Sequence, residues 1–190
     1  GQGQCPQPES VPAAPSDQRA ADAAALLASV GMGEADIFAL GLGGVGAASV
    51  VIGHPTVVGR AAVASADYRS RKAAPDEVPR PMPTDADFQA MRDAYEAVAP
   101  DPPHFDALAE KVSTMVNTAY VGWTADHLRA VQTPTLVLVG DNDLIRVSDA
   151  VEAAELLTHG QLAVLPGTTH MDMTRSPERI LAMVVPFLDA

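Results

Sequence analysis

The chain has 190 residues, of which 47% are hydrophobic and 19% charged, so it can form an apolar core and is not disordered throughout. Its 24 acidic and 12 basic residues give a net charge of −12, which disfavours nucleic acids and anionic membrane surfaces as partners. The single cysteine, Cys5, excludes an internal disulfide and a cysteine-based zinc site. The apolar runs are too short to span a bilayer, and no signal-peptide pattern is seen, so we expect a cytoplasmic protein.

The N-terminal part predicts an irregular lead-in followed by one helix. Residues 1–16 are rich in Pro, Gln and Ser, which favours irregular structure. Ser16 or Asp17 can cap a helix, because a short side-chain oxygen can accept from the free amides of the first turn. The Ala- and Leu-rich stretch that follows reaches Val30, and Gly31 ends it.

Residues 36–65 predict a βαβ unit. The apolar run Asp36–Leu40 is typical of a strand that is buried on both faces, as in a parallel sheet. A glycine turn at Gly41–Gly44 leads into the helical segment Val45–Ile52. A second apolar run, Ala61–Ser65, completes the unit as another strand.

The middle of the chain, residues 66–130, differs in character and predicts a helical insert. Four prolines between residues 75 and 83 interrupt a polar segment. Helical patterns follow at Asp85–Val98 and His104–Ala119.

The remainder returns to alternating strands and helices. Thr135–Val139 and Gln161–Leu165 are predicted strands, while Asp149–Leu157 and Pro177–Leu188 are predicted helices. This alternation predicts an α/β fold with a mostly parallel sheet and helices on both faces.

Three loops follow predicted strands and should therefore meet at one edge of the sheet. They are Gly41–Gly44, Gly140–Asp143 and Pro166–Asp172. In open parallel sheets, ligands bind beyond the carboxyl ends of the strands. The polar side chains expected there are Asp141, Asp143 and His170, of which Asp141 is predicted to stabilise a turn.

Three segments, in this order, resemble motifs of the α/β-hydrolase fold family. ADIFALGLGG at residues 35–44 resembles the nucleophile elbow, TPTLVLVGDND at 133–143 resembles the strand and turn of the acid, and LPGTTH at 165–170 resembles the histidine loop. The resemblance extends from about residue 17 to the C-terminus. It implies that Asp143 is the acid and His170 the general base, in the chain order of the family.

The resemblance also implies a domain organisation and a chemistry. Residues 17–65 and 131–190 would form an α/β-hydrolase-like core, and residues 66–130 a small helical cap. The ancestral reaction would be hydrolysis of an ester or similar acyl bond in a small apolar ligand, with no cofactor and no metal ion.

Two departures from the family pattern affect this expectation. The nucleophile position holds Gly41, which cannot attack a carbonyl, and loss of the nucleophile costs a serine hydrolase on the order of 10⁶ in turnover. Relatives also carry about four strands before the first helix found here, so we expect a truncated core. Within this chain the amide of Leu42 would supply one half of the oxyanion hole. We further expect Asp36–Leu40 to be a sheet edge that self-associates or pairs with a complementing chain.

Three alternative functions remain open at this stage. A His–Asp pair without a nucleophile can act as an acid/base dyad in lyase or cofactor-free oxygenase chemistry. A non-catalytic protein would only bind a small ligand. A third alternative is a dinucleotide site, because Gly41–Gly46 mimics the glycine fingerprint with Asp67 as the acidic residue, but this leaves the acid and histidine loops without a role.

Overall fold

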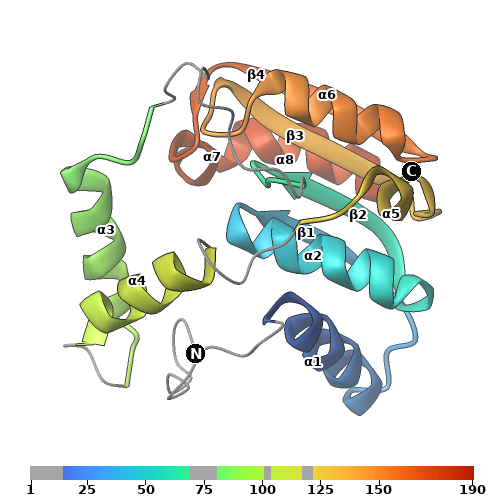
Figure 1. Ribbon diagram of the computed structural model, residues 1–190, viewed down its shortest axis with the longest axis horizontal. Coiled ribbons are helices and arrows are strands. Elements are labelled where there is room, and N and C mark those ends of the chain that lie inside the picture. The colour runs from blue at the N-terminus through green and yellow to red at the C-terminus, as the bar shows by residue number, and fades with distance from the viewer. Residues whose placement is uncertain (1–14, 69–80, 101–103, 117–121) are drawn as a thin grey trace. The chain divides into compact units, whose positions relative to one another are not determined.

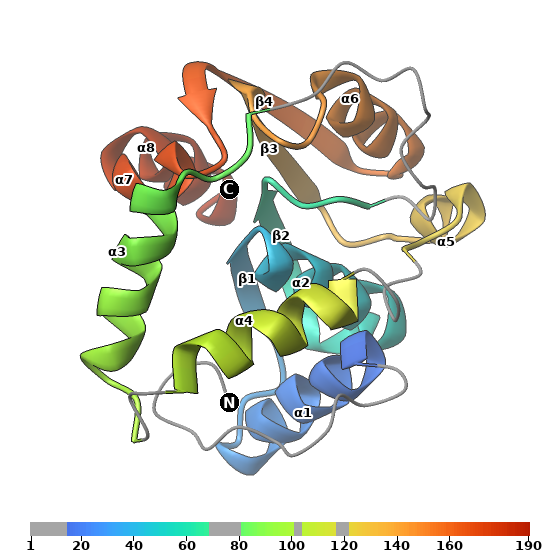
Figure 2. The same ribbon diagram turned by 60° about the vertical axis from the view of Figure 1, so that its left-hand side comes forward.

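The computed structural model describes residues 15–68, 81–100, 104–116 and 122–190. The chain divides into two compact units. The larger unit comprises Ser16–Pro81 and Val121–Ala190 and contains the β-sheet, and the smaller one contains helices α3 and α4 (Figures 1 and 2). Among the described residues, no helix is long and apolar enough to cross a membrane.

The larger unit contains a four-stranded, fully parallel sheet (Figure 1). Its strands are β1 (Ala35–Leu40), β2 (Val58–Ala64), β3 (Thr135–Asn142) and β4 (Gly160–Thr169). They lie in the order β1-β2-β3-β4, so β1 and β4 are the edges of the sheet that the structure describes. The predicted α/β class with a parallel sheet is confirmed.

Helices cover both faces of the sheet because successive strand residues point to opposite sides. One cluster packs strand residues such as Val63 and Val137 against α2 and α6, whereas the other packs Ala64 and Leu138 against α7 and α8. Figure 1 shows α2 and α6 in front of the strands and α8 behind them. The helices have these bounds: α1 Pro15–Ser29, α2 Leu42–Gly53, α5 Ala125–Arg129, α6 Val147–Leu156, α7 Asp172–Arg175 and α8 Pro177–Leu188, with a 3-10 turn at Pro55–Val57.

Strands β3 and β4 extend beyond the predicted ends, which corrects the sequence-based boundaries. The ladder shifts register between Gly140 and Asn142 and then resumes, so that Asn142 pairs with Thr169. A Cβ on Gly140 would lie 2.0 Å from the carbonyl oxygen of Thr168, so only glycine allows this close approach. The extension carries the two strands up to Asp143 and His170, which were expected inside loops.

Two further boundaries differ from the sequence analysis. Helix α1 already begins at Pro15, so neither Ser16 nor Asp17 is its N-cap, and proline is well tolerated in a first turn. The short helix α7 was not predicted, because four residues carry no measurable periodicity. The expected lead-in at residues 1–16 falls, except for its last two residues, outside the described part of the chain.

The smaller unit contains α3 (Asp85–Glu96) and α4 (Phe105–Thr114). Thr84 caps α3 through a reciprocal capping box with Asp87. Arg92 forms an ion pair with Asp106 and lies 4.8 Å from the ring centre of Phe105, which joins the two helices. Helix α5 belongs to the larger unit, and the interpretation of residues 66–130 as a cap stays a prediction.

Candidate active site

The turn between β1 and α2 has an unusual backbone. Gly41 has φ 51° and ψ −121°, a conformation that L side chains rarely adopt and that glycine takes without strain. Its amide donates to the carbonyl of Ala64 at 2.9 Å, and its carbonyl accepts from Gly44 at 2.9 Å. These bonds fix the turn to β2 and to the first turn of α2. The sharp strand–turn–helix geometry is therefore present without a nucleophilic side chain.

Gly44 explains how α2 can start so close to the sheet. A Cβ on this residue would lie 2.6 Å from the Cβ of Ala66 and 2.7 Å from Cγ1 of Val63. The missing side chain lets the first turn of the helix pack directly on β2. The amide of Leu42, the first residue of α2, has no acceptor within its helix, as expected at a helix N-terminus.

His170 lies beside Gly41 and is paired with Asp143. Its Nδ1 is 2.9 Å from Oδ1 of Asp143. Its Nε2 is 3.4 Å from the position that a Cβ on Gly41 would occupy. Asp143 and His170 thus lie within hydrogen-bond distance, and His170 lies beside the Gly41 turn, as expected for loops that meet at one edge of the sheet. One ring nitrogen of His170 therefore contacts Asp143, and the other faces Gly41.

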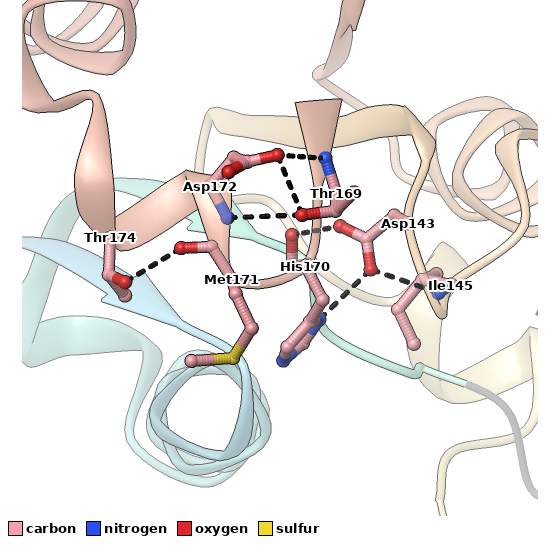
Figure 3. Close-up of polar contacts among 8 residues, drawn as sticks. Asp143, Ile145, Thr169, His170, Met171, Asp172 and Thr174 are labelled. Carbon is pink, nitrogen blue, oxygen red and sulfur yellow. Dashed lines mark hydrogen bonds and ion pairs between the residues drawn. The ribbon is translucent and has the colours of Figure 1, made fainter. Parts of the chain in front are cut away.

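Asp143 is completely buried, with an exposed fraction of 0%, and both of its carboxylate oxygens are occupied. Oδ1 contacts His170 and accepts from the amide of Ile145 at 3.1 Å, while Oδ2 accepts from the hydroxyl of Ser65 (Figure 3). Burial raises the pKa of Asp143, but the bonds from His170, Ser65 and Ile145 together lower it further. The carboxylate therefore stays ionised near neutral pH.

The turn that carries His170 is held by hydrogen bonds between Thr169 and Asp172, which flank His170 and Met171. Oδ2 of Asp172 accepts from the amide of Thr169 at 3.0 Å and from its hydroxyl at 2.7 Å, and the amide of Asp172 donates back to that hydroxyl at 3.3 Å. Figure 3 shows these hydrogen bonds between Thr169 and Asp172. Asp172 also lies at the start of α7, so the turn continues directly into that helix. The orientation of His170 is thus set by the backbone as well as by Asp143.

Asp141 has the turn-stabilising contacts that the sequence analysis predicted. Its Oδ1 accepts from the amide of Thr168 at 3.1 Å, which ties the end of β3 to the end of β4. Bonds from the amides of Gly167 and Thr168 lower the pKa of Asp141. The described residues contain no group of three or more His, Cys, Asp or Glu side chains that could hold a metal ion.

Ser65 was missed by the sequence analysis, which placed it inside a strand. It follows β2 directly and has φ 53°, and it is the one non-glycine residue with positive φ in the part of the chain that the structure describes. Such a conformation costs roughly 1–2 kcal/mol for an L residue. Sequence offers no signal for it beyond its position at the carboxyl end of a strand.

The arrangement is suited to proton transfer. A neutral imidazole whose Nδ1–H donates to a buried carboxylate has a free lone pair on Nε2, which can accept a proton. The carboxylate stabilises the imidazolium that results. A histidine that is suited to accept a proton therefore lies beside the Gly41 turn.

Known proteins resemble this chain in structure. No protein-family model and no curated protein matches the sequence. A 2-hydroxy-6-oxo-6-phenylhexa-2,4-dienoate hydrolase from Rhodococcus is 19% identical with a TM-score of 0.76, covering 99% of this chain and 76% of that one. A meta-cleavage product hydrolase from Pseudomonas fluorescens is 18% identical with a TM-score of 0.70, covering 97% and 75%.

A third similar structure carries the fold name itself. It is an α/β hydrolase from the metagenome of lagoon sediments, 17% identical with a TM-score of 0.67, and the match covers 92% of this chain and 69% of that one. All three matches extend over most of the chain with scores that indicate a shared fold. The parallel sheet with helices on both of its faces agrees with these matches. The chain therefore has the α/β-hydrolase fold.

Proposed function

We propose that this chain derives from hydrolases of esters or similar acyl bonds, and that Gly41 blocks their covalent route. The residues that would carry out its chemistry are then His170 and Asp143. The observation that carries the proposal is the orientation of the His170 ring. Its Nδ1 forms a hydrogen bond with Asp143, and its Nε2 faces Gly41. In a site of this kind, a serine at position 41 would be the nucleophile, and this chain has no atom there to form an acyl intermediate.

The similar structures support the class of chemistry. They are named as hydrolases, and hydrolysis is the reaction that a base beside an elbow and a helix N-terminus serves. In this proposal the amide of Leu42, the first residue of α2, would stabilise a developing oxyanion. It supplies one donor, and removal of one donor from such a site typically costs about 10²–10³ in turnover. We therefore expect weak or absent ester hydrolysis.

A second candidate uses the same pair without any covalent step. His170 would take a proton from bound substrate, as in lyase or cofactor-free oxygenase chemistry. The hydrogen bonds around Asp143 and His170 favour this candidate, because they keep His170 oriented although position 41 has no nucleophile. A protein that only binds a small apolar ligand would need the shape of the site and not this orientation.

Hydrolysis of short p-nitrophenyl esters, measured together with labelling by a fluorophosphonate, tests the proposal. We expect no labelling and a rate near the uncatalysed background for the unmodified chain. A rate that survives the phosphonate but is lost in His170→Ala would support the acid/base candidate instead. His159→Ala, which removes an exposed histidine, is the matched control. Phosphonate labelling of any serine in the unmodified chain would contradict the proposal.

A further inference from the structure

We propose that Ser65 is a positioning residue that holds the carboxylate of Asp143 in the orientation that His170 requires. This inference rests on the proposed function, since it concerns the same pair. The hydroxyl of Ser65 donates to Oδ2 of Asp143, the oxygen that His170 does not contact. Ser65 is 3% exposed, so its hydroxyl has no competing bulk water.

Three separate parts of the fold supply the hydrogen bonds to the carboxylate of Asp143. Ser65 follows β2, Ile145 precedes α6 and His170 follows β4, and all three direct a donor at Asp143. With a donor on each side, the carboxylate cannot rotate about its last bond without breaking at least one hydrogen bond. Its Oδ1 is thereby kept on the line to Nδ1 of His170.

The backbone of Ser65 points to the same role. Its φ of 53° is unfavourable for serine, whereas glycine or asparagine would adopt it more easily. Its amide donates to the carbonyl of Leu138 at 2.9 Å, which anchors the residue to β3. Strained residues of this kind persist where the surrounding structure holds them, and they cluster at functional sites. The side-chain contact with Asp143 supplies a reason for serine here.

Ser65 is not a substitute nucleophile. Its hydroxyl bonds to the carboxylate, while the base nitrogen Nε2 of His170 faces Gly41. Asp143 is a poor proton acceptor for it, because its pKa lies below the ordinary value. The hydroxyl of Ser65 therefore contacts the carboxylate of Asp143, which in turn contacts the imidazole of His170. This arrangement orients the imidazole and does not activate Ser65 as a nucleophile.

Two variants separate the hydrogen bond from the backbone strain. Ser65→Ala removes the donor and keeps the strained backbone, and Ser65→Gly removes the donor and relieves the strain, so at least the second should fold. Ser49→Ala is the matched control, because Ser49 is a buried serine in α2 whose hydroxyl has no hydrogen-bond partner among the described residues. The measurements are the pKa of Asp143 from carboxyl ¹³C shifts and the Nδ1 proton resonance of His170, and neither depends on catalytic activity.

We expect both Ser65 variants to raise the pKa of Asp143 by about one unit, a tenfold change in its ionisation constant, because a donor to the charged form is lost. The Nδ1 proton signal of His170 should shift or broaden in both, and Ser49→Ala should leave both signals unchanged. Unchanged signals in Ser65→Gly and Ser65→Ala would overturn the inference and leave Ser65 as a turn residue. Phosphonate labelling at Ser65 would overturn it too. Absent ester activity would affect neither result.

Discussion

Restoring a side chain at Gly41 is the most direct test of the site. In Gly41→Ser, the new Cβ would lie 3.4 Å from Nε2 of His170, and the next atom, Oγ, can reach the hydrogen-bond range of about 2.6–3.2 Å. Gly41→Ala adds the same Cβ without the hydroxyl. The difference between the two variants therefore isolates the nucleophile.

Both variants should be less stable than the unmodified chain by a similar amount. At φ 51° and ψ −121°, a residue with a Cβ is strained by about 1–3 kcal/mol. For a chain of 190 residues each kcal/mol corresponds to about 2–4 °C in Tm, so we expect a decrease of about 2–12 °C. Among the described residues that are not adjacent to Gly41 in the chain, only the ring of His170 lies within 4 Å of the added Cβ, so steric overlap adds little.

The activity difference follows from the parts that are present. A complete nucleophile and base contribute on the order of 10⁶ in turnover. With Leu42 as one oxyanion donor, about 10²–10³ of that is lost, which leaves a gain of at most about 10³–10⁴ for Gly41→Ser over Gly41→Ala. Ester hydrolysis and fluorophosphonate labelling measure it, with Tm as the check on folding. A folded Gly41→Ser that is neither labelled nor faster than Gly41→Ala would refute this reading of the site.

Three further results are expected. Gly140→Ala should unfold at much lower urea concentration, because its Cβ would lie 2.0 Å from the backbone oxygen of Thr168. Gly46→Ala should raise the free energy of unfolding by about 0.5–1 kcal/mol, because Gly46 lies in a helix and no described residue outside that helix comes within 4 Å of the added Cβ. The pKa of Asp143 in the folded protein is lowered from 3.8, so its ionised carboxylate stabilises the fold above that pH and the stabilisation is lost as pH falls through the folded-state pKa. The free energy of unfolding in urea should therefore depend less on pH, between about pH 2 and 5, in Asp143→Asn than in the unmodified chain. The chain should self-associate in light scattering through the β1 edge, where Phe38 is 39% exposed, and Phe38→Lys should reduce this association; a concentration-independent monomer would contradict it.

The local sequence was sufficient for the class of fold and for the two polar groups of the site. Buried strands such as Thr135–Val139 are uninterrupted apolar runs, and the periodicity of the helices between them is visible without a structure. Asp143 and His170 could be predicted because each lies in a loop after an apolar strand, and the carboxyl ends of parallel strands meet at one edge of the sheet. The choice of these two side chains as acid and base came from the resemblance to the hydrolase motifs. The glycine at position 41 was also visible, because it stands in the segment that resembles a nucleophile elbow.

Tertiary structure decided what depends on contacts between distant segments. At Gly140 the ladder shifts register where the carbonyl of Thr168 comes close to its backbone, and the pairing of β3 with β4 then resumes. This pairing depends on both strands, so neither segment encodes it alone. The hydrogen bond of Ser65 to Asp143 joins residues 78 positions apart, and it depends on a left-handed backbone that serine does not favour by itself. The sequence pattern indicates which residues are buried and which form turns. The hydrogen-bond partner of a buried hydroxyl is fixed only when the strands pack side by side.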